Sequence, residues 1–356
     1  MIDKEYFNNG LFLSELEGLT SDNNNLYFEV SDQLFKKDKI NEKVLNITPA
    51  DSNLDFDSFL VETDNKTYCI KLSFDKDNFL LKNESNLLKN NKSTMLPKYV
   101  SSGIHKIGED ILYLIHEVDR GVSLEDVGSS FIYEKRWMFL QCCSLMMNFK
   151  SETSFIDYAD FVFKHFDLPN TIPEISEKYI YPAHSKESVD LILKTIREYF
   201  YSSFDFSVFE CDAFCHGDLN LKNISTNGNL FKAEDFNFCF RGNPFLDVSF
   251  TCLNFNFNKL MFNNMIKTFC DMHDLNYDAS KPFFRSCLKA ACCIFMYRKF
   301  SEFLVEQCVY ENKRQHKMVE LLQCFTNLEW CFESMPFYKD IQKEFKKICR
   351  SPTKIL

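Results

Sequence analysis

Short apolar runs separated by polar residues dominate the first third of the chain and predict β-strands. The runs are rich in Val, Ile, Leu, Phe and Tyr, and polar or turn-forming residues bound them, as is typical of strands. The strands are predicted at VLNIT (44–48), DSFLVET (57–63), TYCIKLSF (67–74) and ILYLIHEV (111–118).

Beyond Gly121 the apolar residues recur at intervals of three and four positions, which predicts helices. One apolar helical face runs from about residue 133 to residue 150, and residues 188–201 are predicted to form another helix. The same periodicity appears in two stretches near the C-terminus, 283–307 and 316–332. The rest of the chain is therefore predicted to be mainly helical.

The stretch from Phe214 to Asp247 departs from this helical pattern. It reads FCHGDLNLKNISTNGNLFKAEDFNFCFRGNPFLD. His-Gly-Asp turns the backbone after a short apolar strand, and Asn-Gly-Asn supplies a tight reversal between two further apolar runs. The predicted hairpin carries Asp218 and Asn223 on one side and returns Asp235 beside them.

Two carboxylates and one carboxamide that meet at one point suit Mg²⁺, which prefers oxygen ligands and shares its coordination with nucleotide phosphates. Phosphoryl transfer needs metal ligands, a base that orients the attacking hydroxyl, and a cation on the phosphates. We therefore predict Asn223 and Asp235 as the metal ligands and Asp218 as the catalytic base. A His-Gly-Asp triplet alone occurs by chance, but the ordered set with Asn223, Asp235 and a later Gly-Asn-Pro is much less expected by chance.

Lys71 is a charged residue inside a strongly apolar predicted strand, between Ile70 and Leu72. Glu84 follows at the start of a helical pattern, and a Lys-Glu pair that holds an ammonium against phosphates is the kinase arrangement. The alternative is that Lys71 lies on the solvated face of its strand and Glu84 on a solvated helix face. With the downstream motif present, we favour phosphate binding by Lys71 and positioning by Glu84.

The motifs HGDLNLKN, DF and GNPFLD resemble the signature of the aminoglycoside phosphotransferase and choline kinase superfamily, the small-molecule relatives of protein kinases. The resemblance extends from about Asn53 to Asp247. It implies an α+β, two-lobed, protein-kinase-like fold with a small antiparallel-sheet N-lobe and a larger, mainly helical C-lobe. It also implies ATP, Mg²⁺ and a small molecule that accepts phosphate on a hydroxyl group.

The resemblance further implies three segments: an N-terminal extension (1–40), a nucleotide-binding lobe of sheet and helix (41–119), and a lobe with the catalytic hairpin and a helical acceptor-binding subdomain (120–356). Two pairs of residues join the predicted nucleotide site. Ser52 and Asn53 match the loop over the phosphates, although this loop has no Gly, and backbone groups near Glu117 and Val118 match the hinge that meets adenine.

Composition narrows the choice of partners. The 356 residues carry a formal charge of −10, which argues against a nucleic-acid binder and weakly favours a cationic acceptor. The 15 Cys form no Cys-x-x-Cys pair and many have apolar neighbours, as is typical of reduced thiols in a cytoplasmic protein. We expect no signal peptide, no membrane partner and no membrane span. The sequence gives no indication of oligomeric state.

The predicted function is ATP-dependent transfer of the γ-phosphate to a hydroxyl of a small molecule, such as an amino sugar, a choline-like amino alcohol or another sugar. An alternative is a catalytically weak or inactive kinase-like nucleotide-binding module, which the Gly-free phosphate loop motivates. Protein phosphorylation is disfavoured, because GNPFLD follows Asp235 closely and leaves little room for an activation loop.

Overall fold

The computed structural model describes residues 20–50, 56–94, 96–118, 121–123, 183–204, 213–226, 231–255, 257–309, 314–333 and 335–350. Contacts within the chain divide these residues into two compact units. Unit 1 takes the described residues within 1–129 and 222–238, and unit 2 takes those within 155–221 and 239–356. The segment boundaries predicted from the sequence stay predictions.

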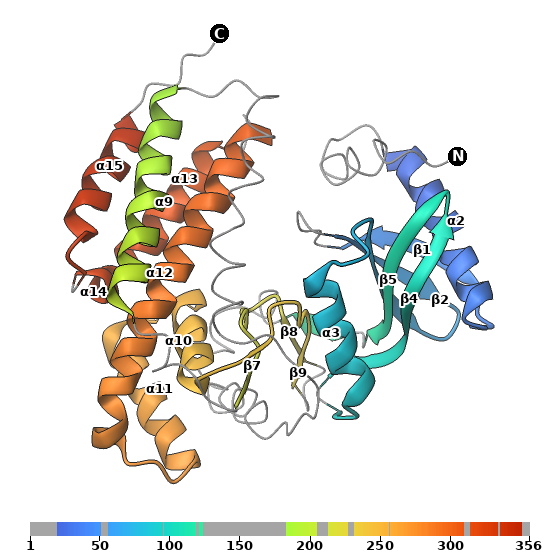
Figure 1. Ribbon diagram of the computed structural model, residues 1–356, viewed down its shortest axis with the longest axis horizontal. Coiled ribbons are helices and arrows are strands. Elements are labelled where there is room, and N and C mark those ends of the chain that lie inside the picture. The colour runs from blue at the N-terminus through green and yellow to red at the C-terminus, as the bar shows by residue number, and fades with distance from the viewer. Residues whose placement is uncertain are drawn as a thin grey trace. The chain divides into compact units, whose positions relative to one another are not determined.

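Unit 1 is built on an antiparallel sheet in the order β1-β2-β3-β5-β4 (Figure 1). Its strands are β1 (Val44–Pro49), β2 (Asp57–Thr63), β3 (Thr67–Ser73), β4 (Lys98–Ile107) and β5 (Glu109–Val118). The four strands predicted from the apolar runs are confirmed, whereas β4 was not predicted. Its burial pattern explains this result, because most residues of β4 are only half-buried.

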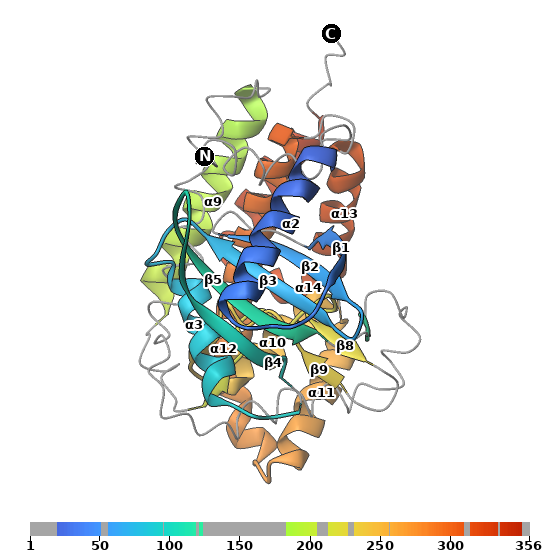
Figure 2. The same cartoon turned by 90° about the vertical axis from the view of Figure 1, so that its right-hand side faces the viewer.

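The two faces of this sheet differ in chemistry. Helix α2 (Thr20–Lys37) packs across one face, where Tyr27 stacks on Phe59 and Ile115 joins the same apolar core (Figure 2). Cross-strand partners share a face of a sheet, and so do alternate residues of one strand. Lys71 is paired with Leu114, and Cys69 with His116, so these four side chains belong to the other face.

A second helix and a small hairpin complete unit 1. Helix α3 (Phe79–Asn90) begins where the Asn78 side chain accepts a hydrogen bond from the Leu81 backbone N–H at 2.9 Å. Strand β8 (Ile224–Thr226) pairs with β9 (Phe231–Ala233) and with β6 (Val122–Ser123). The predicted hairpin is thereby confirmed, while its predicted Asn-Gly-Asn turn (227–229) lies outside the described residues.

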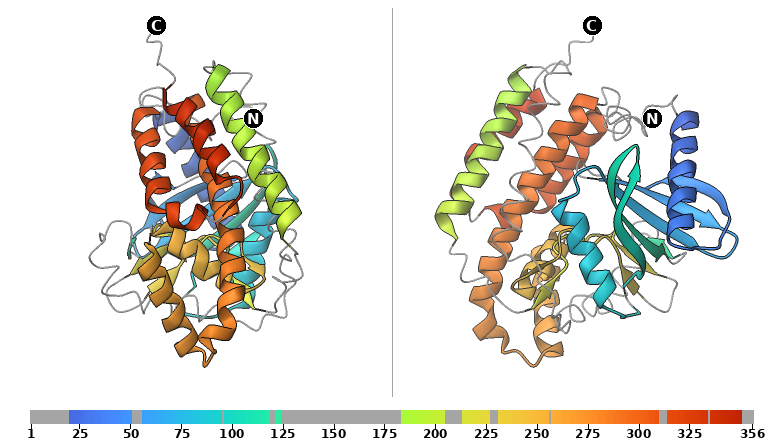
Figure 3. Two further views of the ribbon diagram at one scale, coloured as in Figure 1. Left: turned by 90° about the vertical axis from the view of Figure 1, so that its left-hand side faces the viewer. Right: turned by 45° about the vertical axis from the view of Figure 1, so that its right-hand side comes forward.

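Unit 2 is mainly helical, with one two-stranded ladder between β7 (Phe214–Cys215) and β10 (Phe240–Arg241). Its helices are α9 (Ala183–Ser203), α10 (Pro244–Asn254), α11 (Lys259–Met272), α12 (Tyr277–Val309), α13 (Arg314–Asn327), α14 (Glu329–Phe332) and α15 (Tyr338–Arg350). The long α12 packs against α9, α10, α11 and α13, and α15 packs against α9 (Figure 3). No described helix meets the length and apolarity that a membrane crossing requires.

Aromatic rings and thiols fill the core of unit 2. The ring of Phe325 packs on the rings of Phe300 and Phe345, and the thiols of Cys292 and Cys293 on α12 are fully buried. The helices predicted at 188–201, 283–307 and 316–332 are confirmed, the last as two helices that break at Leu328. The apolar face predicted for residues 133–150 lies outside the described residues.

Candidate active site

An ion cluster lies on the face of the unit 1 sheet that carries Lys71, opposite the face on which α2 packs. Lys71 is 5% exposed, and its Nζ lies 2.7 Å from Glu84 Oε2 and 2.7 Å from Asp235 Oδ1. We call Lys71, Glu84 and Asp235 the Lys71 cluster. Strand β3 supplies Lys71, helix α3 supplies Glu84, and the segment after β9 supplies Asp235. Three separate elements of unit 1 therefore position the cluster. The alternative that Lys71 and Glu84 face solvent is wrong for both side chains.

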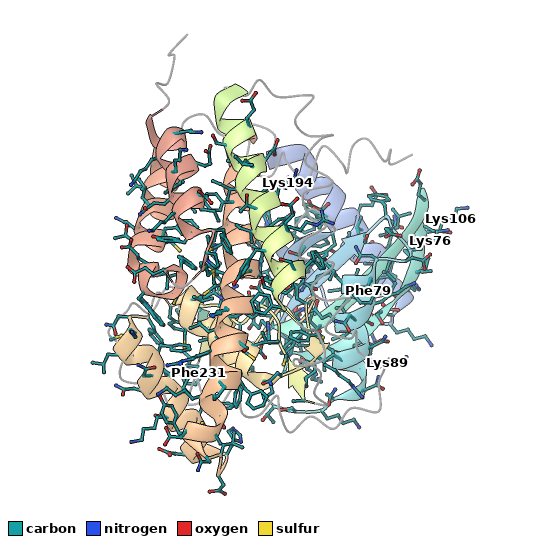
Figure 4. The ribbon with its side chains drawn as sticks, turned by 60° about the vertical axis from the view of Figure 1, so that its left-hand side comes forward. Lys76, Phe79, Lys89, Lys106, Lys194 and Phe231 are labelled. Atoms are coloured by element: carbon teal, nitrogen blue, oxygen red, sulfur yellow. The ribbon has the colours of Figure 1, made fainter. Side chains whose placement is uncertain are left out.

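Helix α3 fixes the carboxylate of Glu84. Four buried leucines at helical spacing, Leu80, Leu81, Leu87 and Leu88, turn one face of α3 into unit 1, and Glu84 shares that face with 0% exposure. Figure 4 labels Phe79 and Lys89, which mark the two ends of this helix. The second oxygen of Glu84, Oε1, accepts a hydrogen bond at 3.3 Å from the backbone N–H of Phe236. Glu84 therefore holds both the ammonium of Lys71 and the backbone that follows Asp235.

The Lys71 side chain stays protonated at neutral pH. Burial lowers the pKa of this ammonium, but the carboxylates of Asp235 and Glu84 outweigh burial and raise the pKa well above its usual range. Burial also raises the pKa of Glu84, and the ammonium of Lys71 opposes that shift. A permanently charged ammonium next to a partly exposed carboxylate is an arrangement that can bind phosphate oxygens and a metal ion together.

Asp235 is the accessible member of the Lys71 cluster. Its side chain is 37% exposed, and its Oδ1 also accepts a hydrogen bond from Asn237 Nδ2. Its φ of 63° lies in the left-handed region, which only Gly, Asn and Asp adopt with little cost. The carboxylate is therefore held at a backbone position that most residues disfavour.

Asn223 lies opposite Glu234, the residue before Asp235, at the open end of the hairpin. The Asn223 carbonyl accepts a hydrogen bond at 2.8 Å from the backbone N–H of Glu234, so the backbone of Asn223 lies one residue from Asp235 across the ladder. Their carboxamide and carboxylate oxygens are the hard ligands that Mg²⁺ prefers. Among the described residues, no group of three or more His, Cys, Asp or Glu is arranged to hold a metal ion.

Unit 2 contains the predicted catalytic base, Asp218, in what we call the Asp218 turn: residues 216–218 together with Asp247. The Asp247 carboxylate, from the first turn of α10, accepts the backbone N–H groups of His216 at 2.5 Å and Gly217 at 2.9 Å. Gly217 has a φ of 81°, which Gly adopts without a steric cost. The ring Nδ1 of His216 accepts the backbone N–H of Asp218 at 3.3 Å.

These contacts assign a structural role to His216 and Asp247. Burial raises the pKa of Asp247 to about 7, and the two backbone N–H donors act in the opposite direction. The side chains of Asp247 and His216 therefore fix the backbone of the turn through three hydrogen bonds.

Arg298 is a residue of this site that the sequence did not reveal. It lies on α12, and its Nη1 and Nη2 lie 2.6 Å and 3.1 Å from the two carboxylate oxygens of Asp218. This two-point contact is the strong geometry of an Arg-carboxylate pair. The available signal was a guanidinium that interrupts an apolar helical run, but the sequence did not indicate a partner 80 residues away.

The remaining predicted site residues are only partly described. Ser52 and Asn53 lie outside the described residues. The Glu117 carboxylate pairs with Lys66 at 2.6 Å and Lys98 at 2.8 Å. Partial burial raises its pKa, but these two ammonium groups outweigh burial and lower it. Its side chain is therefore committed to the sheet, and only its backbone, with that of Val118, remains a candidate for nucleotide contact.

Comparisons with known proteins address the fold. No protein-family profile matches the sequence, and no curated protein matches it significantly. Among solved structures, a thermostable mutant of aminoglycoside phosphotransferase APH(4)-Ia with AMP-PNP and hygromycin B is similar with a TM-score of 0.53 and 13% identity, over 86% of this chain and 99% of that chain.

Two further structures extend this likeness to other small-molecule kinases. Amicoumacin kinase hAmiN in complex with AMP-PNP, Ca²⁺ and Ami is similar with a TM-score of 0.53 and 12% identity, over 88% of this chain and 99% of that chain. Choline kinase LicA from Streptococcus pneumoniae has a TM-score of 0.50 and 13% identity, over 85% of this chain and 99% of that chain.

The predicted α+β fold is confirmed by these likenesses, since unit 1 has the small antiparallel sheet and unit 2 the larger set of helices. The chain has the kinase-like fold shared by aminoglycoside phosphotransferases and choline kinase.

Proposed function

We propose that the protein is a phosphotransferase that moves the γ-phosphate of ATP, with Mg²⁺, to a hydroxyl group of a small molecule. Lys71 binds nucleotide phosphates, and Glu84 holds its ammonium in place. Asn223 and Asp235 bind the metal ion, which neutralises charge on the phosphates when bound. Asp218 orients the acceptor hydroxyl and takes its proton.

The observation that carries this proposal is the Lys71 cluster. An ion pair between a buried strand lysine and a helix glutamate costs desolvation energy, and hydrophobic residues of the same volume would often be at least as stable. Here the ammonium also contacts the partly exposed carboxylate of Asp235 at 2.7 Å. This combination supports a role in binding anions and a metal ion rather than in stability alone.

The covalent chain limits how far the proposed base is from the proposed metal ligands. Asp218 and Asn223 are five residues apart, so their Cα atoms lie within roughly 18 Å of each other in any arrangement of the two units. The proposal requires Asp218 and the metal ligands to act on one phosphate group, which this length of chain permits. Phosphoryl transfer draws its rate mainly from such positioning and from charge stabilisation.

The acceptor belongs to a class rather than to a named compound. Solved structures with this fold have been obtained with hygromycin B and with Ami, and one is a choline kinase. The formal charge of −10 favours a cationic acceptor such as an amino sugar or an amino alcohol, with a neutral sugar as the alternative. A cytoplasmic location, where ATP is abundant, belongs to the same proposal.

A second candidate function is nucleotide binding without useful turnover, in a regulatory or scaffold role. The observation that favours it is the absence of Gly from the loop that contains Ser52 and Asn53. The retained Asp218, Asn223 and Asp235 favour catalysis instead. The two functions differ in one measurable property, which is phosphate transfer to a hydroxyl.

The test is a panel of hydroxyl acceptors incubated with γ-labelled ATP, with and without Mg²⁺, using the full chain. We expect Mg²⁺-dependent labelling of at least one amino sugar, amino alcohol or sugar. Asp218→Asn should nearly abolish labelling and leave ATP affinity largely unchanged, because Asp218 is not assigned to the nucleotide. Normal turnover by this variant would refute the base, and ATP binding with no labelled product across the panel would favour the second function.

A further inference from the structure

His116 stands out from the other buried polar side chains of the chain. It is 3% exposed, and within the described ranges it is the residue whose buried side-chain atoms, Nδ1 and Nε2, have no hydrogen-bond partner. Buried polar groups are nearly always paired, since an orphaned one costs free energy. A buried polar group without a partner in the protein is a candidate for pairing with a ligand.

The position of His116 in the sheet indicates which ligand. It is paired across the strands with Cys69, two residues along β3 from Lys71, and therefore belongs to the same face as the Lys71 cluster. Two residues along a strand span roughly 7 Å. Along this face, the ammonium of Lys71 is followed by the unpaired ring of His116. A nucleotide has its phosphates at one end and its base at the other, so it can contact both groups at once.

The imidazole is neutral at physiological pH. Burial and the nearby ammonium of Lys71 lower its pKa to about 3, and the backbone of Glu117 acts in the opposite direction without reaching hydrogen-bond geometry. A neutral imidazole has one N–H donor and one acceptor nitrogen, and either nitrogen can carry the proton. It is therefore a hydrogen-bonding group rather than a charge.

A metal-binding role for His116 does not fit. Among the described residues there is no cluster of three or more His, Cys, Asp or Glu that could hold a metal, and the partner across the strand is the single buried thiol of Cys69. Burial raises the pKa of that thiol to about 12, so it is not a thiolate ligand at neutral pH.

We propose that the His116 ring reads the base of a purine nucleotide, forming a hydrogen bond with its 6-substituent while the phosphates bind Lys71. This inference rests on the proposed nucleotide binding and adds a specificity-determining residue to it. The ring accepts from a 6-amino group in one tautomer and donates to a 6-oxo group in the other. The site is thus expected to take adenine and guanine nucleotides alike and to discriminate against a purine without a 6-substituent.

The test measures affinity rather than turnover. ADP, GDP and purine riboside 5′-diphosphate are titrated calorimetrically into the full chain and into His116→Met, which keeps the bulk of the side chain and removes its hydrogen bonds. For the wild type, we expect ADP and GDP to bind within about tenfold of each other and purine riboside diphosphate about tenfold more weakly. In His116→Met the first two should weaken by about tenfold, while the third is unchanged.

Two further variants serve as controls for this test. His116→Gln retains a donor and an acceptor, so it should restore part of the preference for ADP and GDP. Ile115→Met is the matched control, because Ile115 precedes His116 on β5 but packs in the core under α2, and it should leave all three affinities in their wild-type ratio. Removing an orphaned polar group should also raise the apparent Tm of unliganded His116→Met by about 2–4 °C.

The outcomes separate the two proposals. Wild-type protein that binds none of the three diphosphates would overturn both the proposed function and this inference. Wild-type protein that binds them, with the same ratio of ADP to purine riboside diphosphate affinity in His116→Met, would overturn the inference alone.

Discussion

The Lys71 cluster of unit 1 and the Asp218 turn of unit 2 hold their carboxylates by different means. In the cluster, one ammonium compensates Glu84 and Asp235, each at 2.7 Å, so removal of one group leaves the others uncompensated. In the turn, Asp247 is held by two backbone N–H groups and Asp218 by the guanidinium of Arg298. The stability of the cluster therefore depends on the balance of its charges, whereas the conformation of the turn depends on the geometry of its hydrogen bonds.

This difference separates what each region contributes to the proposed reaction. A buried charge network fixes the electrostatic potential at the phosphates, and it remains effective only while all its members are present. A backbone turn held by a carboxylate fixes the direction of one side chain. We expect substitutions in the cluster to change stability and nucleotide binding together, and substitutions in the turn to change mainly the rate.

The largest effect is expected from Lys71→Met. The variant leaves Glu84 buried without its ammonium, so the free energy of unfolding should fall by about 3 kcal/mol, and phosphate transfer should fall by about 10³-fold. Urea denaturation and a labelled-ATP assay measure the two effects. The double variant Lys71→Met, Glu84→Gln should recover most of the stability and none of the activity, and failure to recover stability would contradict the charge-compensation account.

Asp247→Ala should have the next largest effect and tests the turn. The backbone N–H groups of His216 and Gly217 would lose their buried acceptor, at a cost of about 2 kcal/mol. The rate should fall by about 10²-fold while ATP affinity, measured by calorimetry, stays within twofold of wild type. Asp271→Ala, at an exposed position of α11, is the control, and an equal loss of ATP affinity in Asp247→Ala would remove the distinction between the two regions.

Arg298→Gln should have a smaller effect, confined to the rate. Without the guanidinium, both oxygens of Asp218 lose a charge-assisted partner, so we expect kcat to fall by about tenfold and ADP affinity to remain unchanged. Arg285→Gln provides the matched control, because Arg285 is exposed on the same helix. A weaker ADP affinity in Arg298→Gln alone would place this guanidinium at the nucleotide instead.

The smallest effect is expected at Asp57, a buried carboxylate of β2 outside both regions, where burial raises the pKa to about 7. The folded state then keeps a proton that the unfolded chain has lost, so this residue makes stability fall as pH rises from about 4 to about 7, by about 1.4 kcal/mol per pH unit. Asp57→Asn should flatten that slope in urea denaturation across this range, and Asp64→Asn, in an exposed turn, should not. A slope unchanged by Asp57→Asn would show that Asp57 is ionised in the folded protein.

The sequence predicted the Lys71 cluster more completely than the surroundings of the Asp218 turn, for a physical reason. Lys71 interrupts an apolar strand and Glu84 lies on an apolar helical face, so local pattern alone marks both as unusual. Arg298 also interrupts an apolar helix, but its partner is fixed by the packing of α12, which local pattern does not encode. The half-buried β4 escaped prediction because neither a period of two nor a continuous apolar run marks it.

The unpaired ring of His116 was beyond sequence reasoning for a similar reason. A histidine in an apolar strand is usually a packed residue, and its hydrogen-bond status depends on neighbours from other strands. Only the register of β3 and β5 places it with Cys69 and on the face that carries Lys71. The sequence thus indicates which residues are chemically unusual, and the packing decides what each one meets.

The buried thiols make the protein its own reporter of local opening. Among the described cysteines, Cys69 lies in unit 1, whereas Cys292 and Cys293, in the middle of α12, lie in unit 2. A thiol held away from water, with its pKa raised by burial, reacts with an alkylating reagent only when its surroundings open. Timed alkylation followed by peptide mass spectrometry would therefore record the local opening of the sheet and of the helices separately in one sample, without any residue being substituted.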